Sequence, residues 1–461
     1  MMNNSDCKNI NNNNKLKKEL NAYSLAGIGI GGIVGSGFFL GSGIAIKQAG
    51  PAVILAFLFG GLIMSQVLGA MTSISINRPV TGSFRVYTEQ FLGKFTGYLL
   101  GWIIYISSIL GIASEAVAAA VFLKYWFPQV SIALLALCVI IVVILINRLN
   151  MKYFSYIESG TAVLKILTIA IFIGIGLVFL LSHGVQSKPI PYNTLNNFFP
   201  NKFSGLLRSM LVVIFTYSGI STIAMATSDV RKPCLSIPKA TILVTTGLVT
   251  LYTLTMCVIV LTINWSNINI TSSPIIQSLN SMDINWASPI INLIILIATF
   301  SVMIGNYYSC NQTIISLSEA KEAPPIFKEK TKKDFYWNAW ILTGIISLLV
   351  ILVSFLVSAK LFNYLVSACS YYSFFNWIVN LIVYLIWLKK RSSEEKYASP
   401  LILGKAGAYG TIVIIILLFV ISLEVQDFRI GFYSAAIIIF LIGISLSLIH
   451  ISEPTRLALI S

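Results

Sequence analysis

The sequence predicts an all-α membrane protein that crosses a lipid bilayer twelve times, and three observations support this fold class. Of the 461 residues, 57% are apolar and 10% are charged, whereas a soluble domain carries about 25% charged residues. The apolar residues fall in blocks of about 20, the length of helix that crosses a bilayer core. The charged residues gather in the short segments between these blocks.

A polar tail, residues 1–21, comes before the first block and lacks the order of regions that marks a signal peptide. The membrane domain, residues 22–445, contains the apolar blocks, and their even number predicts that both ends of the domain lie on one side. The blocks are 22–46, 52–76, 95–122, 131–146, 159–181, 206–228, 240–263, 288–318, 339–357, 362–388, 408–423 and 431–444.

The placement of positive charge predicts which side this is. Alternate segments, starting with the N-terminal tail, hold 22 of the 31 Lys and Arg residues, and the opposite loops hold seven. Cytoplasmic loops gather Lys and Arg, so we expect both termini in the cytoplasm and the chain in the cell membrane. The same placement explains the net charge of +15 without a nucleic acid partner. The scattered cysteines lack metal-ligand spacing, so we expect no metal site.

The last residues need separate treatment. Residues 446–456 read L-S-L-I-H-I-S-E-P-T-R, which matches the translation of a transposon-end adapter used in sequencing libraries. We therefore expect that the native sequence stops near Ser445, that residues 446–461 are an artefact, and that the last helix is truncated. Different codons over this stretch in the source nucleotide sequence would refute this expectation.

The first apolar block is rich in glycine, with G-I-G-I-G-G-I-V-G-S-G-F-F at 27–39. The spacing of Gly27, Gly29 and Gly32 fits a dinucleotide-binding pattern, but that pattern requires a strand before the helix. Two interpretations remain: close packing of helices through small residues, or a helix that unwinds at residues 35–37. An unwound helix would offer free N–H groups and a positive dipole end to a carboxylate.

A second break favours the unwound helix. The sixth block contains F-T-Y-S-G-I-S at 215–221, again with Ser-Gly near its middle. First and sixth spans correspond to each other when two five-helix repeats are inverted, and substrate then binds between their breaks. Carbonyl groups freed at the second break could accept hydrogen bonds from an ammonium group. A carboxylate at one break and an ammonium group at the other describe a zwitterionic amino acid.

Further motifs make the pattern specific. Residues 33–43 read I-V-G-S-G-F-F-L-G-S-G, and Q-A-G-P follows at 48–51. R-P-V-T-G-S-F then occurs at 78–84, Y-W-F-P at 125–128 and K-P-C-L-S-I-P-K-A at 232–240. In this order and spacing, the chain resembles the amino acid–polyamine–organocation (APC) superfamily, and within it the amino-acid permease branch.

The resemblance implies a leucine-transporter-type fold with two inverted repeats of five helices, discontinuous first and sixth helices and two peripheral helices. It also implies a secondary active transporter that imports an amino acid by alternating access, without a cofactor. In such a fold the substrate carboxylate lies on the backbone around Ser36 and Gly37. The ammonium group lies near the carbonyls of Ile33, Phe215 and Ser218, and the Phe215 ring closes over the substrate. The predicted substrate site is Ile33, Gly35, Ser36, Gly37, Phe215, Ser218, Gly219 and Ser221.

Two ionisable residues inside the spans are functional candidates, because charges within a membrane are costly. Lys165 lies in the fifth span, and burial disfavours its charged form, so it can load and release a proton. We expect proton symport with Lys165 as a coupling residue; the alternative is a permanently charged brace. Glu115 in the third span could bind a cationic side chain, relay protons or satisfy a buried polar network. Glu158 lies near the cytoplasmic end of the fifth span, where we expect it to help the helix begin.

One departure from the family pattern bears on the substrate. The permease branch usually has G-x-E in the sixth span, where this chain has Gly219-Ile220-Ser221. Ser221 supplies neither a negative charge nor a proton site, which favours a neutral or hydroxyl-bearing amino acid, although Glu115 keeps a cationic one open. The alternatives are an amino-acid exchanger or antiporter and a non-transporting sensor of the germinant-receptor type. We do not expect an enzyme, and the pattern indicates no oligomeric state.

Overall fold

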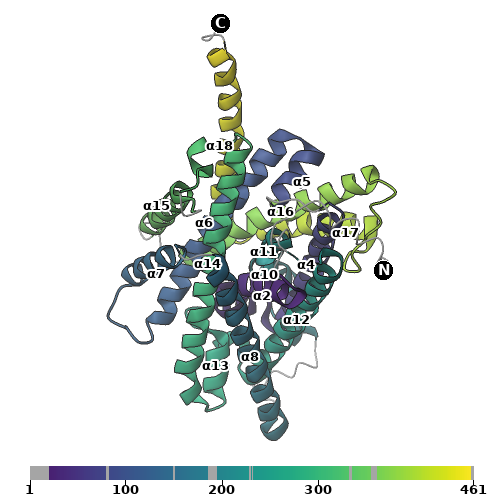
Figure 1. Ribbon diagram of the computed structural model, residues 1–461. Helices are drawn as coiled ribbons and strands as arrows, with labels where there is room; N and C mark the ends of the chain where they lie inside the picture. Colours follow the sequence, from purple (N-terminus) through teal and green to yellow (C-terminus); the bar gives the residue numbers. More distant parts are fainter. Residues whose placement is uncertain are drawn as a thin grey trace.

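A computed structural model describes residues 20–78, 83–148, 151–184, 195–227, 230, 232–331, 335–354 and 361–457. Every regular element within these ranges is helical, and one isolated parallel β-bridge joins Leu20 to Val230. The all-α prediction is therefore confirmed for the described part of the chain (Figure 1). Most of the predicted polar tail lies outside the described residues.

The longer helices carry most of the fold. They are α2 (Ala22–Ile33), α3 (Ser42–Ala49), α4 (Val53–Asn77), α5 (Ser83–Leu92), α6 (Lys94–Leu123), α7 (Ile132–Ile146), α8 (Met151–His183), α10 (Lys202–Tyr217), α12 (Pro233–Thr262), α13 (Pro274–Ser281), α14 (Ser288–Glu319), α15 (Trp337–Ser354), α16 (Leu361–Lys390), α17 (Gly404–Ser422) and α18 (Gln426–Leu457). The short ones are η2 (Gly37–Gly41), η3 (Gly50–Ala52), α9 (Leu195–Phe198), η4 (Ser218–Ile220), α11 (Ser221–Ala226), η6 (Trp265–Asn267), η7 (Asn285–Ala287) and η8 (Pro325–Lys328).

Nine helical segments of the described chain are long and apolar enough to cross a membrane, and three shorter apolar helices accompany them. The shorter helices are α2, α7 and α15. The 15 residues of α7 give about 22 Å of helix, less than the roughly 30 Å of a bilayer core. A membrane fold with many spans is thus confirmed, and the count of twelve crossings stays a prediction.

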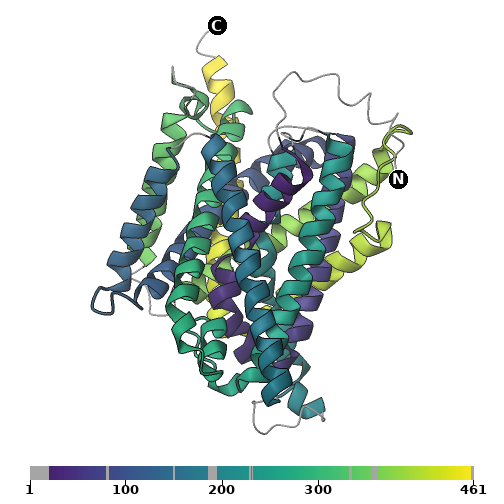
Figure 2. The same ribbon diagram turned by 60° about the horizontal axis from the view of Figure 1, so that its bottom comes forward.

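The helices are arranged around the two interrupted segments. Figure 1 shows α2, α10 and α11 near the centre, and α2 packs against α8, α12 and α14. The pairs α6–α14 and α4–α12 pack along their lengths. One edge is the pair α7–α15 (left in Figure 2). Apolar side chains on α17, such as Val413, Leu417 and Val420, are more than half exposed, as expected of a helix that faces lipid.

The chain leaves the α-helix at both predicted places. After α2, Val34 adopts an extended conformation, and the chain resumes at Ser36 and continues through the π-helical turn η2. In the sixth block, α10 gives way to the 3-10 turn η4 before α11 begins. The Ser218 hydroxyl donates to the Phe215 carbonyl at 2.8 Å, and such side-chain bonds compete with helical ones.

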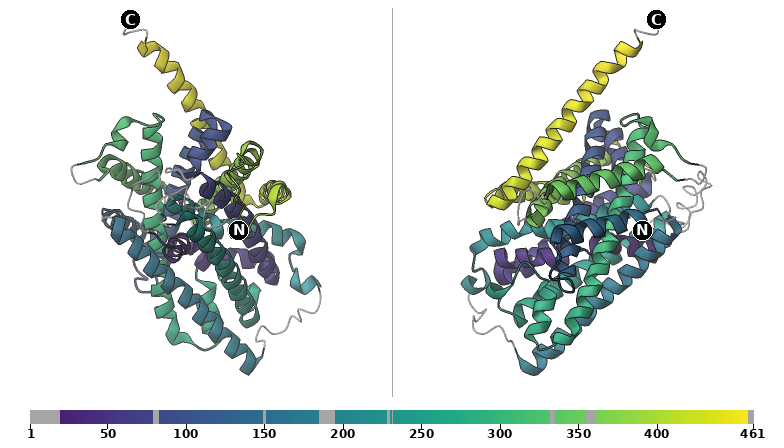
Figure 3. Two further views of the ribbon diagram at one scale, coloured as in Figure 1. Left: turned by 45° about the vertical axis from the view of Figure 1, so that its right-hand side comes forward. Right: turned by 90° about the vertical axis from the view of Figure 1, so that its left-hand side faces the viewer.

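The last helix continues past the predicted boundary. α18 runs from Gln426 to Leu457 without a break at Ser445, and Figure 3 shows its end projecting beyond the neighbouring helices. The assignment of residues 446–461 to an adapter stays a prediction that the codons test.

An ion cluster outside the spans ties α5 to the end of α14. Arg85 is 5% exposed, and its Nη1 donates to Glu322 Oε2 at 2.9 Å and to Glu89 Oε2 at 3.1 Å. Burial raises the pKa of Glu322, while Arg85 lowers it and the charge of Glu89 raises it. The cluster therefore depends on Arg85 to keep two neighbouring carboxylates together.

We expect Arg85→Gln to destabilise the protein by about 3–5 kcal/mol, the cost of leaving a buried charge without its partner. The loss should shrink at acid pH: without Arg85 the pKa of Glu322 rises further, so protonation relieves the repulsion. Thermal unfolding in detergent measures this effect. Arg208→Gln is the matched control, because Arg208 and Glu424 form an exposed pair worth about 0–1 kcal/mol. Equal losses in the two variants would contradict the prediction.

Candidate functional site

The two breaks meet at the centre of the molecule, in backbone contact. A Cβ atom added at Gly37 would lie 2.8 Å from a ring carbon of Phe215. One added at Gly219 would overlap the carbonyl oxygen of Gly32 and lie 2.9 Å from the Cα atom of Ile33. Only glycine allows so close an approach, so the Ser-Gly pairs found in the sequence bring the two breaks together.

Gly219→Ala should therefore destabilise the fold by about 1–3 kcal/mol, the usual cost of overpacking. The added methyl group would meet the backbone of α2, which cannot change its position as easily as a flexible side chain. Apparent melting temperatures in detergent test this. Gly247→Ala is the control: it lies in α12 with no atom within 4 Å of the added Cβ, and the better helix propensity of alanine should leave it unchanged or slightly stabilised.

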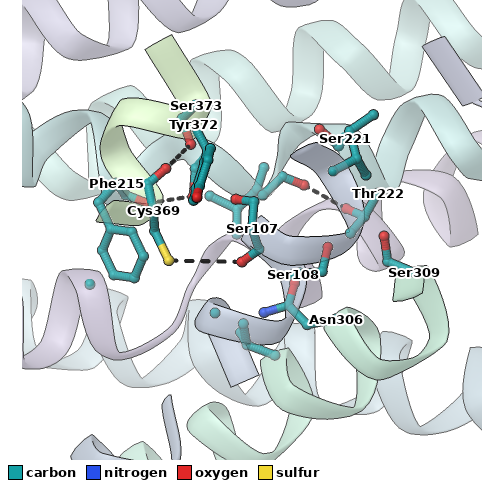
Figure 4. Close-up of a pocket in the computed structure, with 18 of the residues that line it drawn as sticks. Ser107, Ser108, Phe215, Ser221, Thr222, Asn306, Ser309, Cys369, Tyr372 and Ser373 are labelled. Carbon is teal, nitrogen blue, oxygen red and sulfur yellow. Dashed lines mark hydrogen bonds between the residues drawn. The ribbon is translucent and has the colours of Figure 1, made fainter. Parts of the chain in front are cut away.

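A cavity opens beside the breaks and is lined by residues of α2, η2, α6, α10, η4, α11, α14 and α16 (Figure 4). Seven of the ten residues predicted for substrate or proton binding line it: Ile33, Gly37, Glu115, Phe215, Ser218, Gly219 and Ser221. Gly35, Ser36 and Lys165 are not among its lining residues. The structure thus brings the two breaks and Glu115 to one cavity, whereas the sequence indicated Glu115 separately from the breaks.

Glu115 makes the main polar contact at the first break. The Ser36 N–H donates to both oxygens of the Glu115 carboxylate at 3.0 Å, and Glu115 is 3% exposed. A Cβ atom at Gly35 would lie 2.5 Å from Glu115 Oε1, so glycine makes room for this carboxylate. A carboxylate of the protein thus occupies a donor that the resemblance assigns to the substrate.

Other groups at the breaks are partly engaged. The Phe215 carbonyl accepts from the Ser218 hydroxyl, and the Gly219 carbonyl accepts from Thr222 Oγ1 at 2.8 Å. The Ser36 hydroxyl is buried and makes no hydrogen bond within the described part of the chain. Phe215, 9% exposed, covers Gly37 at the edge of the cavity.

The far side of η2 is packed with aromatic rings. Phe38 stacks on Tyr252 with ring centroids 3.9 Å apart and meets Phe57 edge-on at 6.0 Å. All three rings are fully buried. This packing holds η2 on one side and leaves its other side to the cavity.

Lys165 lies behind the first break. Its ammonium group donates to the Gly31 carbonyl at 2.6 Å and to Ser301 Oγ at 3.2 Å, and the residue is 1% exposed. The Ser301 hydroxyl donates in turn to Glu158 Oε2 at 2.8 Å. Lys165, Ser301 and Glu158 therefore link α2, α8 and α14 through one buried network.

The structure corrects the expected place of Glu158. This residue is 1% exposed, its Oε1 atom lacks a hydrogen-bond partner among the described residues, and its carboxylate packs against Gly31. It does not help the helix begin at a solvent-exposed end. Glu158 and Lys165 are seven residues apart, a spacing that puts both on one face of α8. This spacing is the feature of the sequence that indicates a pairing of the two residues.

The cavity also contains residues that no motif singled out. Polar residues of α6, α14 and α16 complete its wall: Ser107, Ser108, Asn306, Ser309, Ser373 and Asn376. Polar amides inside apolar spans are uncommon, so Asn306 and Asn376 could have been proposed on that ground. Nothing in the sequence indicated that their helices meet at the breaks.

Comparison with known proteins identifies the family. A family model described as amino acid permease matches residues 25–455. An uncharacterized amino acid permease of Bacillus subtilis, YvbW, is 31% identical over 391 residues, covering 84% of this chain and 88% of that protein. The gamma-aminobutyric acid permease of B. subtilis is 29% identical, over 83% and 81% of the two chains. The aromatic amino acid transport protein AroP of Escherichia coli is 23% identical, over 93% and 95%.

These matches confirm the resemblance drawn from the motifs and, with the apolar helices, identify a multi-pass membrane protein. They indicate a transporter rather than an enzyme. The chain belongs to the amino acid permease family.

Proposed function

We propose that this protein imports an amino acid across the cell membrane by proton symport, using alternating access around the two breaks. The observation that carries the proposal is the Glu115 carboxylate on the Ser36 N–H. That N–H lies at the break where the substrate carboxylate is expected. The protein's carboxylate and the substrate's carboxylate therefore compete for the same donor.

This competition supplies a coupling step. Two carboxylates held close together repel each other, so both cannot be ionised at one helix break. Protonation of Glu115 removes the repulsion and weakens its hold on Ser36, and the substrate carboxylate can then accept from the freed N–H groups near the helix dipole. A proton is thus bound before, or together with, each substrate.

The second break supplies the other end of the site. Ile33 and Ser218 line the cavity, and their carbonyls would accept hydrogen bonds from a substrate ammonium group. The Phe215 ring covers Gly37 and would close over the bound molecule. In this proposal a zwitterionic substrate binds between the breaks, with its carboxylate at Ser36 and its ammonium group at η4.

Lys165 links its own protonation to the position of α2. A charged ammonium makes a strong hydrogen bond to a carbonyl, and here it holds the Gly31 carbonyl two residues before the first break ends α2. Loss of the Lys165 proton weakens this bond and frees α2 to move against α8 and α14. We assign Glu115 to proton-dependent substrate binding and Lys165 to the coupling of protonation with helix movement.

The orientation follows the charge distribution. The segments that share a side with the N terminus hold 22 Lys and Arg residues against seven in the opposite loops. By the positive-inside tendency, these segments and both termini face the cytoplasm. Import then means movement of substrate from the side of α3 to the side where α2 begins.

Uptake of radiolabelled amino acids into proteoliposomes tests the proposal. An inward proton gradient should drive accumulation, and a sodium gradient of the same size should not. Uptake that requires internal amino acid would instead establish an exchanger, and binding without uptake would establish a sensor. Liposomes without protein and a proton ionophore are the controls.

A further inference from the structure

The wall opposite the breaks is built from neutral polar groups. Asn306 of α14 faces Gly111 of α6, and a Cβ atom at Gly111 would lie 2.8 Å from Asn306 Nδ2. Glycine at position 111 therefore makes room for the carboxamide. Ser107 and Ser108 lie one turn earlier on α6, and Ser309 lies nearly one turn later on α14, as Figure 4 shows.

The Asn306 carboxamide makes no hydrogen bond within the part of the chain that the structure describes, although it lines the cavity. Tyr372 lines the same cavity, is 1% exposed, and its hydroxyl has no partner among the described residues. The Tyr372 hydroxyl is buried, where an unpaired polar group is costly, and the half-buried Asn306 carboxamide lies at the cavity. Both groups are therefore available to a ligand that can pair with them.

The charge of the cavity restricts the ligand. Among the described lining residues Glu115 is the one carboxylic acid, and no Lys, Arg or His is present. An acidic side chain would meet no cation, and a basic one would find Glu115 already bound to Ser36. An apolar substrate side chain would leave the Asn306 amide unpaired. A site built from polar groups binds such a substrate much more weakly than one that pairs with them.

The distance from the first break selects the length of the side chain. Glu115 contacts Ser36 at the break, and Gly111 lies four residues before it on the same helix, a rise of about 6 Å. Gly111, which the Asn306 carboxamide contacts, thus lies about one helical turn along α6 from Glu115. The terminal amide of a side chain with one or two methylene groups reaches this far.

We propose that the transported amino acid carries a carboxamide side chain, as asparagine and glutamine do, and that Asn306 pairs with this group. An amide offers one acceptor and two donors, so two carboxamides can form a pair of hydrogen bonds. Ser107 and Ser309 surround the pair with hydroxyl groups. The inference rests on the proposed function and narrows its substrate.

Equilibrium binding to the purified protein tests the proposal with asparagine, leucine and aspartate, which are similar in shape and differ in polarity and charge. Glutamine, serine and threonine complete the set of ligands. Asparagine or glutamine should bind at least about tenfold more tightly than leucine or aspartate. Asn306→Leu should remove this preference. Asn292→Leu, the same change elsewhere on α14 and outside the cavity, should keep it.

Ser107→Ala provides a milder variant should Asn306→Leu fail to fold, and we expect a several-fold weakening for the carboxamides alone. Equal binding of leucine and asparagine, or tighter binding of serine and threonine, would overturn the carboxamide inference while leaving amino-acid transport intact. A protein that binds and transports none of the twenty amino acids would overturn the proposed function itself.

Discussion

Glu115→Gln should abolish proton-driven accumulation of substrate while leaving exchange of internal for external substrate intact. Glutamine has nearly the same shape and keeps an acceptor for the Ser36 N–H, but it carries no charge and cannot titrate. The substrate carboxylate then no longer competes with a fixed charge. Proteoliposome uptake under a proton gradient should fall to the level set by equilibration, and counterflow should continue.

The competition between Glu115 and the substrate also predicts how substrate affinity changes with pH. In the wild type, rising pH ionises Glu115 and strengthens the competitor, so the substrate Kd should increase, by at most about tenfold per pH unit for one proton. In Glu115→Gln the Kd should be flat over the same range. Glu424→Gln, which removes an exposed carboxylate paired with Arg208, is the control and should behave as wild type. Full accumulation by Glu115→Gln would exclude Glu115 as the proton site.

Lys165→Ala should also abolish proton-driven accumulation, for a different reason. The variant loses the bond to the Gly31 carbonyl and leaves Ser301 and Glu158 without their cation. Binding of substrate should persist, because Lys165 does not line the cavity. A Lys165→Ala variant that keeps full accumulation in vesicles would eliminate the coupling role.

Lys165→Gln distinguishes a role of Lys165 in proton coupling from a role as a permanently charged brace between helices. Glutamine can still donate to a carbonyl but cannot release a proton, so a mere brace would be largely replaced and transport would survive. We expect accumulation to be lost. Adding Glu158→Gln should recover thermal stability, because an unpaired buried carboxylate is removed, without restoring accumulation. Recovery of both would show that Lys165 acts through stability alone.

The sequence was sufficient for the features that depend on local composition. Apolar blocks predicted the helices, and Ser-Gly pairs inside them predicted both interruptions, because these residues weaken a helix wherever they occur. Glu115 and Lys165 stood out because charges inside apolar blocks are rare. The π-helical turn at 37–41 was not predicted, since it depends on how η2 packs against neighbouring aromatic rings.

The rest of the site depends on contacts between distant segments. Glu158 was misplaced because its partner, Ser301, lies 143 residues away on α14, and only the packing of α8 on α14 makes the pair visible. Asn306 faces the substrate cavity for the same reason: its neighbour Gly111 belongs to α6. The hydrogen bond between the Ser36 N–H and Glu115 likewise joins residues 79 positions apart, so no local sequence pattern predicts it.

The buried charges around the breaks have an electrical consequence. As long as Lys165 keeps its proton, its charge offsets that of Glu158, and an ionised Glu115 then gives the empty site one net negative charge. A proton on Glu115 makes the site neutral, and a zwitterionic substrate adds no net charge. A membrane potential that is negative inside therefore does no work on the loaded carrier, whereas it pushes the empty, negative site outward with up to about 2.3 kcal/mol per 100 mV. Voltage would then accelerate the return of the empty carrier rather than the entry of the amino acid.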